Sequence, residues 1–403
     1  MQTPPTVSAP VSSSVARAGG TRQILGFVYF TFIVYLSIGL PLAVLPPYVH
    51  YRMGFSAALA GLVISIQYIA TLLSRPWAGR ISDRAGAKVS VLWGMAICTG
   101  SGAFLVAAAA LHSIPWLSFC ALIFSRLALG VGESLGSTGA TLWGITSAGP
   151  EWTAKVISFN GISTYGAMAV GAPLGVILDK HVGLGSLGLL TALLGGVSFV
   201  LAMRKSGVPV TPGEHLPFRD VLGRVAPHGM ALALGGVGYS VLATCVTLYY
   251  ISRHWNENGA ALCLTAFGIA FIAARLLFIQ VINRFGGFPV CIACLSVESV
   301  GVLLLWSAGS PWMASCGAAL TGFGFSLVFP ALGVEAVKRV PMHNRGTALG
   351  VFTGFSDVSF FLVGPVAGAV IGAWGYSSAF LFALACVLGA LGIVLVLRRM
   401  QEG

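Results

Sequence analysis

The sequence predicts an all-α integral membrane protein whose twelve transmembrane helices form two pseudo-symmetric six-helix bundles, with both termini in the cytoplasm. Three observations predict this fold class: the composition, the spacing of the apolar runs and the placement of the basic residues. Of 403 residues, 57% are hydrophobic and 8% are Asp, Glu, Lys or Arg, whereas soluble domains carry roughly 25% charged residues. This composition excludes an aqueous enzyme, a disordered chain and, despite the net charge of +11, a nucleic-acid-binding protein.

The apolar runs have the length that a bilayer requires. A hydrocarbon core of about 30 Å, at about 1.5 Å per helical residue, needs roughly 20 residues. Twelve runs of this kind lie between charged or turn-rich breaks, near residues 24–47, 56–76, 89–111, 115–137, 156–178, 186–203, 226–250, 260–281, 288–309, 312–334, 346–372 and 376–397.

The basic residues gather on one side of these runs. When the breaks are placed alternately on two sides, seventeen of the 22 Lys and Arg residues fall on one side and three on the other. Such an excess marks the cytoplasmic side and supports an even number of spans. The expected parts are a disordered cytoplasmic tail (1–20), an N-terminal bundle (21–204), a cytoplasmic linker (205–224), a C-terminal bundle (225–399) and a short tail (400–403).

The two halves of the chain echo each other. The segment from Arg75 to Gly86 matches the segment from Arg275 to Gly286 in its Arg, Arg and Gly residues at an offset of 200, with Asp83 opposite Asn283. A second echo, at an offset of 192 or 193, relates spans five and eleven and is expected to form close helix packing. Its residues are Gly171, Pro173 and Gly175 in span five, and Gly364, Pro365 and Gly368 in span eleven.

One motif is specific enough to suggest a family. The segment Gly79-Arg-Ile-Ser-Asp83-Arg84-Ala-Gly86-Ala-Lys88 resembles the loop 2–3 signature of the major facilitator superfamily. The spacing Arg126-x-x-x-Gly130-x-Gly132 resembles the span-four motif of its proton antiporters, and the stretch 166–175 looks like a degraded form of their span-five motif. The stretches 38–50 and 325–334 are similar to the YhhS-type branch of bacterial inner-membrane transporters. The resemblance implies a multi-pass transporter of the bacterial inner membrane.

The resemblance also implies a role for the loop between spans two and three. In the family this loop latches the two halves in the outward-facing state, and Asp83 would contact the start of span eleven near Arg345 and Gly346. A carboxylate is favoured at a helix N-terminus, where backbone N–H groups are unpaired. The alternative is a plain basic inner loop. The residues assigned to the latch are Gly79, Asp83, Arg84, Gly86 and Lys88.

Ionisable residues within spans are expensive and mark functional sites. Arg126 and Glu133 lie two helical turns apart on one face of span four. By the resemblance they would face the pathway, with Arg126 binding an anionic group or holding a carboxylate ionised, and Glu133 carrying a proton. A structural ion pair between them, or with span one, is the alternative. Asp357, near mid-depth in span eleven, is a candidate for proton exchange, against the alternative of a hydrogen-bonded packing residue.

Other polar residues within the spans receive more modest interpretations. Glu298 is expected to pack against neighbouring helices near Arg275, while Arg75 and Arg275 are interpreted as structural residues that snorkel to the inner interface. Eight polar residues are candidates for the lining of a substrate cavity, each with ordinary helix packing as the alternative: Tyr29, Tyr35, Gln67, Asn160, Tyr165, Tyr239, Thr244 and Ser326.

Together these features favour a secondary active transporter that exports a small organic molecule by proton antiport through alternating access. A proton symporter that imports a solute is the nearest alternative, and a non-transporting membrane sensor is a remote one. We expect no catalytic residues, no metal site and no cofactor, since no phosphate-binding loop or metal spacing is present. The expected partners are the substrate, protons and the lipid bilayer, with no nucleic acid, and the chain is expected to act as a monomer.

Overall fold

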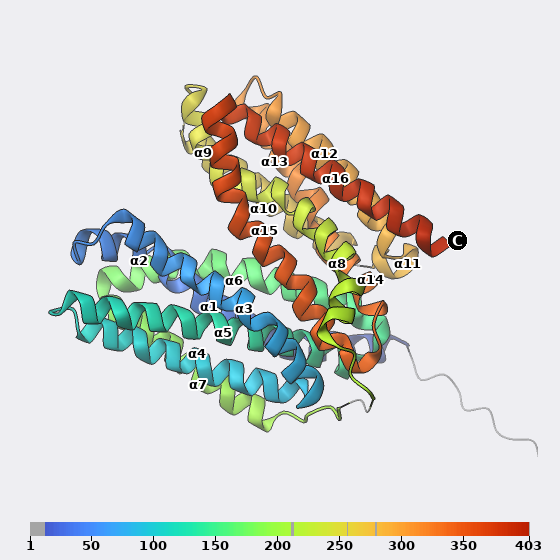
Figure 1. Cartoon of the computed structure of the whole chain (residues 1–403), viewed down its shortest axis with the longest axis horizontal. Coiled ribbons are helices and arrows are strands. Elements are labelled where there is room, and N and C mark those ends of the chain that lie inside the picture. The colour runs from blue at the N-terminus through green and yellow to red at the C-terminus, as the bar shows by residue number, and fades with distance from the viewer. Residues whose placement is uncertain (1–12, 211–212, 256, 279, 403) are drawn as a thin grey trace, which may run out of the picture.

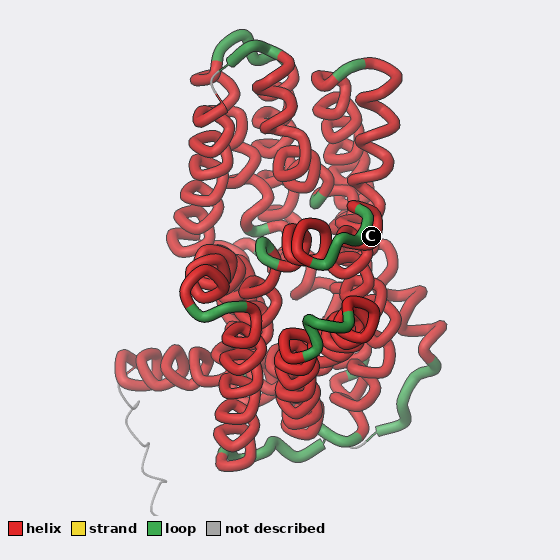
Figure 2. Tube along the Cα trace, turned by 90° about the vertical axis from the view of Figure 1, so that its left-hand side faces the viewer, coloured by secondary structure: helices red, strands yellow, loops and turns green. Residues whose placement is uncertain are grey.

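The structure, a computed structural model, describes residues 13–402 apart from 211–212, 256 and 279. Every regular element in these residues is helical, and two groups of helices lie at an angle to each other (Figures 1 and 2). The helices of the first group are α1 (Ser13–Leu42), α2 (Leu45–Pro47), α3 (Ala57–Arg84), α4 (Ala87–Ala110), α5 (Pro115–Ala148), α6 (Thr153–His181) and α7 (Leu184–Arg204). A π-helix (Tyr48–Arg52) follows α2, and a short 3-10 helix (Pro150–Trp152) precedes α6.

The helices of the second group are α8 (Phe218–Gly235), α9 (Val237–Ser252), α10 (Glu257–Phe278), α11 (Val281–Phe285), α12 (Gly287–Trp306), α13 (Pro311–Ser326), α14 (Val328–Lys338), α15 (Arg345–Trp374) and α16 (Tyr376–Glu402). A 3-10 helix (Met342–Asn344) precedes α15. Within the described residues eleven helices are long and apolar enough to cross a membrane, and Leu262–Phe278 is a shorter apolar helix. Each of the twelve predicted spans therefore has a helical counterpart.

Several boundaries differ from those expected. Helix α1 begins at Ser13, inside the segment predicted to be a disordered tail, and α8 begins at Phe218, inside the predicted linker. Helix α5 continues to Ala148, well beyond the predicted end of span four. In each case the helix includes polar residues, some of them charged in α1 and α8, that an apolar run leaves out.

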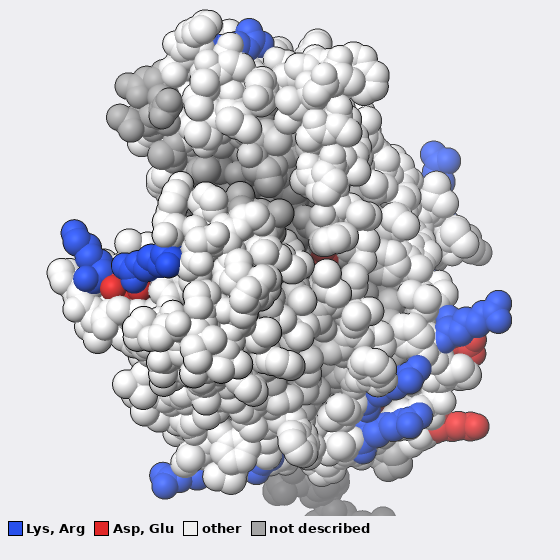
Figure 3. All heavy atoms as spheres, turned by 60° about the vertical axis from the view of Figure 1, so that its left-hand side comes forward, with Lys and Arg blue, Asp and Glu red and all other residues white. Residues whose placement is uncertain are grey.

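The two groups meet along two seams. We call the contact between α3 and α15 the α3–α15 seam, and the contact of α6 with α10 and α14 the α6–α10 seam. In Figure 1 the groups converge where α8 and α14 lie and diverge toward α2 and α9. Lys and Arg side chains gather toward the ends of the molecule in Figure 3, with a broad uncharged face between them. Such a face is suited to contact with the hydrocarbon core of a bilayer.

The glycine echo packs closely in one half only. A Cβ atom on Gly171 would lie 3.0 Å from the backbone of Gly39 in α1, and one on Gly175 would meet the carbonyl oxygen of Leu40. The corresponding residues of α15 do not pack closely against another helix. Gly364, Pro365 and Gly368 are exposed, and a Cβ on either glycine would meet nothing within 4 Å. The prediction of close packing at this second site is therefore wrong for this structure.

Candidate functional site

A buried arginine of α3 joins the two helix groups at the centre of the molecule. Arg75 Nε donates to Asp357 Oδ2 of α15 at 2.8 Å, and Nη1 donates to Ser137 Oγ of α5 at 3.0 Å. Nη2 lies 3.5 Å from Glu133 Oε1. Arg75 is only 3% exposed, so the expectation that it snorkels to the interface is wrong. Its guanidinium instead holds two carboxylates, one from each group.

Arg126 and Glu133 are bridged rather than paired. Gln67 Nε2 donates to Glu133 Oε2 at 3.3 Å, and Gln67 Oε1 accepts from Arg126 Nη1 at 3.1 Å. Thr71 Oγ1 also donates to Glu133 Oε2, at 2.9 Å. Among the described side chains, no ion pair within 4.0 Å joins Arg126 to Glu133, so the direct pair considered from the sequence is not formed.

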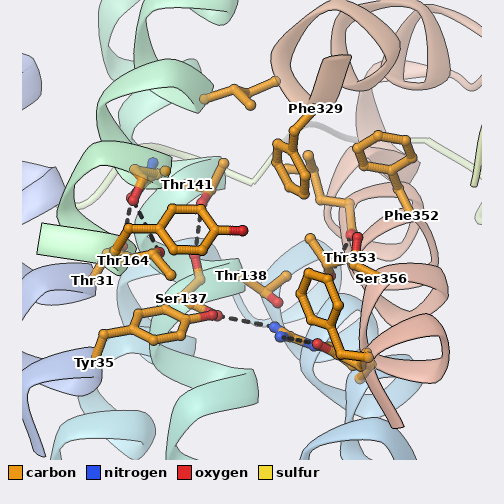
Figure 4. A pocket seen from close by; sticks show the side chains of 18 of the residues that line it. Thr31, Tyr35, Ser137, Thr138, Thr141, Thr164, Phe329, Phe352, Thr353 and Ser356 are labelled. Atoms are coloured by element: carbon orange, nitrogen blue, oxygen red, sulfur yellow. Dashed lines mark hydrogen bonds and ion pairs between the residues drawn. The ribbon is translucent and has the colours of Figure 1, made fainter. Parts of the chain in front are cut away.

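A cavity lies between the two groups, beside this cluster (Figure 4). In Figure 4, Tyr35, Ser137 and Thr138 of one group face Phe329, Phe352 and Thr353 of the other. The lining combines three charged residues with hydroxyl, amide and aromatic side chains. They include Arg75, Arg275, Asp357, Thr31, Tyr35, Ser137, Thr138, Thr141, Asn160, Thr164, Tyr165, Phe325, Phe329, Phe352, Thr353, Ser356 and Phe360.

Of the eight predicted lining residues, Tyr35, Asn160 and Tyr165 line this cavity. The other five contact protein instead. Tyr29 accepts a hydrogen bond from Ser198, Gln67 lies behind the cluster and Tyr239 stacks on Phe267 and Phe325. Thr244 bonds to carbonyls of its own helix, and Ser326 Oγ donates to Phe271 O. The expectation that these five line the cavity is wrong for this conformation.

Arg275 of α10 is the second buried guanidinium of the cavity. It is 1% exposed, and its hydrogen-bond partners are backbone carbonyls. Nε donates to Ser326 O at 3.0 Å, Nη1 donates to Ser158 O of α6 at 3.3 Å, and Nη2 also donates to Ser326 O. The expectation that Arg275 snorkels to the interface is therefore also wrong.

Glu298 packs against neighbouring helices, as expected, but no hydrogen bond or ion pair among the described residues joins it to Arg275. Glu298 of α12 is fully buried, and neither of its carboxyl oxygens has a hydrogen-bond partner among the described residues. It lies against the backbone positions of Gly238 and Gly324.

Asp83 connects the end of α3 to the first turn of α15. Its Oδ1 accepts from the backbone N–H of Gly346 at 2.6 Å, and its Oδ2 accepts from the N–H and the hydroxyl of Thr347, both at 2.7 Å. A carboxylate suits this position because the first N–H groups of a helix lack internal partners. Close backbone approach supports the contact, since a Cβ on Gly79 would lie 2.6 Å from Thr347 Cα.

The remaining residues of the loop 2–3 motif act within the first group. Gly86 adopts a φ of 101°, which favours glycine, immediately before α4. Lys88 Nζ donates to the carbonyls of Met203 and Lys205, at 2.9 and 2.7 Å, and so caps the end of α7. Arg84 is exposed.

On the opposite seam, Asn283 occupies the position that echoes Asp83. Its Nδ2 donates to Glu151 O, just before α6, at 3.1 Å. Among the described residues no three His, Cys, Asp or Glu side chains are grouped so that they could hold a metal ion.

Comparisons with known proteins agree with this architecture. A model of the Major Facilitator Superfamily matches residues 27–227 and 228–402. An "Uncharacterized MFS-type transporter" of Pseudomonas aeruginosa is 55% identical over 390 residues, covering 97% of this chain and 96% of the relative. A transporter of the same description from Burkholderia pseudomallei is 51% identical over 381 residues, covering 94% and 93%.

Solved structures share the fold at low sequence identity. The human organic anion transporter MFSD10 has a TM-score of 0.76 at 16% identity, covering 93% of this chain and 99% of that one. A bacterial homologue of the iron transporter ferroportin, in an outward-facing state, has a TM-score of 0.76 at 16% identity, covering 93% and 98%. FucP in its outward conformation has a TM-score of 0.73 at 18% identity, covering 92% and 97%. The chain therefore belongs to the Major Facilitator Superfamily, and it is a multi-pass membrane transporter rather than an enzyme.

Proposed function

We propose that this protein is a proton-coupled transporter that exports a small organic molecule by antiport across the bacterial inner membrane. The observation that carries the proposal is the Arg75–Asp357 ion pair, which joins the two helix groups beside the cavity. A carboxylate in that place can couple proton binding to a change of conformation, because its protonation removes a bond between the two moving halves. We also propose that the chain belongs to the YhhS-type branch and works as a monomer with both termini in the cytoplasm.

Asp357 is the better placed of the two carboxylates to exchange a proton. Its side chain is 15% exposed and lines the cavity, whereas that of Glu133 is 4% exposed and lies behind Arg75. A proton that enters from the cavity reaches Asp357 first. Glu133 then keeps the guanidinium partly neutralised while Asp357 is protonated. In this proposal Asp357 exchanges the proton and Glu133 supports Arg75.

The coupling step follows from the position of the ion pair on the α3–α15 seam. Three contacts follow one another along this seam: the Asp83 hydrogen bonds, the close approach of Gly79 to Thr347, and the Arg75–Asp357 pair. All three must separate before the halves can part at the end where Asp83 lies. Protonation of Asp357 removes the innermost contact and favours that opening, which is a change of access to the cavity.

The hydrogen bonds of Asp83, at the end of the same seam farthest from the cavity, support a latch role for this residue. Its three hydrogen bonds exist only while α15 lies against α3. Since positively charged loops stay in the cytoplasm, the end that carries Arg80, Arg84 and Arg345 is proposed to be cytoplasmic. The conformation described here would then be closed to the cytoplasm.

Export rather than import rests on the span-four motif. Gly130 and Gly132 let α5 approach α3 and α4 closely, because a Cβ at either position would meet Gln67 O or Cys98 Sγ. Symport of an imported solute uses the same carboxylate and remains the second candidate. A sensor would have no need of an ion pair that can be broken from within a cavity.

The test uses everted membrane vesicles that hold an inward proton gradient, read by a pH-sensitive dye. A panel of sugars, lipophilic cations, amphiphilic drugs and organic acids is added to vesicles with the wild-type protein or with Asp357→Asn. Collapse of the gradient by one compound, in wild type only, supports antiport. No collapse in everted vesicles, together with solute-driven proton entry in right-side-out vesicles, would reject antiport in favour of symport.

A further inference from the structure

The two cavity arginines occupy echoing positions but have different surroundings. Arg75 and Arg275 are 200 residues apart, and each reaches across a seam to the other helix group. Arg75 has two carboxylates as partners. Among the described residues, no Asp or Glu lies within 4.0 Å of the Arg275 guanidinium. One buried cation is therefore neutralised by the protein and the other is not.

The echo between the halves shows which residues stand where the carboxylates would be. A Cβ on Gly130 would meet Gln67 O, and one on Gly322 would meet Phe267 O. This pairs α5 with α13 at an offset of 192, so that Phe325 takes the place of Glu133. The span-five echo likewise sets Thr164 or Tyr165 opposite Asp357.

The described neighbours of Arg275 do not supply a negative charge in another way. Arg275 Cζ lies 4.6 Å from the centre of the Phe271 ring, and its N–H groups donate to the carbonyls of Ser158 and Ser326. These contacts satisfy hydrogen bonds but leave the positive charge. An uncompensated buried charge is strongly unfavourable, so its retention beside a cavity needs a counter-ion from outside the protein.

The absence of a side chain at Gly161 lets the Arg275 guanidinium reach the cavity. Gly161 of α6 lines the cavity, and a Cβ there would collide with Arg275 Nη1. Tyr165, Phe325 and Phe360 add aromatic walls nearby. A guanidinium at one side of an aromatic cavity is suited to bind a carboxylate or a similar anionic group while the rings cover an apolar body.

We infer that the transported solute is an organic anion whose charged group pairs with Arg275. This inference rests on the proposed transport function but not on its direction. Arg275 acts here as a binding residue, and Gly161 as the residue that admits its guanidinium. Removal of the Arg275 charge should weaken the binding of anions at least tenfold and leave the binding of neutral analogues unchanged.

The experiment measures binding to the purified full-length protein in nanodiscs, through the ligand-dependent rise of the unfolding midpoint. The probes are benzoate, phenylacetate and benzenesulfonate, each beside its neutral amide, with benzylamine as the cation. Wild type should bind each anion more tightly than its amide. Arg275→Gln should lose this preference and Arg275→Lys should retain part of it, while Arg219→Gln, at an exposed position of α8, should match wild type.

If Arg275→Gln does not fold, Thr164→Asp decides, because it supplies an internal counter-ion and should abolish the preference for anions. Equal binding of anions, amides and benzylamine by wild type, or an unchanged preference in folded Arg275→Gln or Thr164→Asp, would overturn the inference. The binding assay does not require that the protein transport protons. Anion binding without any proton movement in vesicles would reject only the proposed function. Proton-coupled transport of a neutral or cationic compound would reject only the inference that the solute is an anion.

Discussion

The substitution Asp357→Asn tests whether the ion pair between α3 and α15 controls the opening of the seam. The side chain keeps its size but loses its charge, so Arg75 retains Ser137 and Glu133 and loses its partner at 2.8 Å. The variant imitates the protonated carboxyl permanently. We expect it to shift the protein toward the state in which the seam is open, and to separate solute movement from proton movement.

The size of the shift follows from the burial of the pair. Exposed ion pairs contribute about 0–1 kcal/mol, and removal of one partner from a fully buried pair costs about 3–5 kcal/mol. The pair lies between these limits, because the Arg75 side chain is 4% exposed and that of Asp357 is 15% exposed. A value of about 2 kcal/mol corresponds to roughly a thirtyfold change in the equilibrium between closed and open seams.

The assay is a distance measurement between spin labels on Ala85→Cys and Met342→Cys, in a background from which the native cysteines have been removed. Both positions are exposed and lie on opposite sides of the seam. Asp357→Asn should transfer population from the short distance to a long one, and Asp220→Asn, an exposed aspartate of α8, should not. A distance distribution in Asp357→Asn identical to that of wild type would refute the assignment of the ion pair to the seam.

Three further predictions concern residues away from this pair. Asp83→Asn should reduce transport several-fold without loss of folded protein, because it weakens three hydrogen bonds at the start of α15; wild-type uptake or efflux rates at equal expression would contradict the latch. Gly175→Ala should lower thermal stability by about 1–3 kcal/mol through overpacking against α1, while Gly368→Ala should have little effect; similar melting curves for the two would contradict the packing argument. Glu298→Gln should leave transport unchanged and stability within about 1 kcal/mol, since the carboxyl has no partner to lose among the described residues; a complete loss of proton coupling would assign it a role.

The spans were predictable because the bilayer imposes one length and one polarity on every helix. Breaks within spans were not. Span seven is divided at Gly236 and span ten at Leu327, yet the apolar runs continue through both positions. Hydropathy records which side chains avoid water, and it contains no term for a change in backbone direction inside the membrane.

The depth of Arg75 shows why part of the site was missed. The predicted second span ends at residue 76, but α3 continues to Arg84, which places Arg75 about 14 Å from the end of the helix at about 1.5 Å per residue. Polar residues end an apolar run even where they pack between helices, as Asp83 does against α15. Glu133 and Asp357 were found because an isolated carboxylate in an apolar run is conspicuous, and the repeat of Arg75 at Arg275 was the signal that could have located the arginines.

Proton exchange at Asp357 and anion binding at Arg275 together determine whether proton and solute favour or exclude each other. Protonation of Asp357 removes a negative charge from the cavity, while the charges of the neighbouring groups, Arg75, Glu133 and Tyr35, do not change in that step. The cavity becomes more positive, so a proton on Asp357 and an anion on Arg275 favour each other's binding. By reciprocity the anion then favours protonation to the same degree.

Positive coupling of this kind belongs to proton and solute moving together, whereas antiport requires that each exclude the other. If the anion inference holds, anion affinity should rise on the order of fivefold or more when the pH is lowered, and the rise should disappear in Asp357→Asn. This result would favour symport, the second candidate, over the export proposed from the span-four motif. The opposite result would be an anion affinity that decreases as the pH is lowered in wild type and does not depend on pH in Asp357→Asn. That result would show that the proton and the anion compete, and it would support antiport. Anion affinity measured against pH on one purified protein therefore decides between antiport and symport. The span-four motif predicts that affinity decreases as the pH is lowered, and the electrostatics of the cavity predict that it increases.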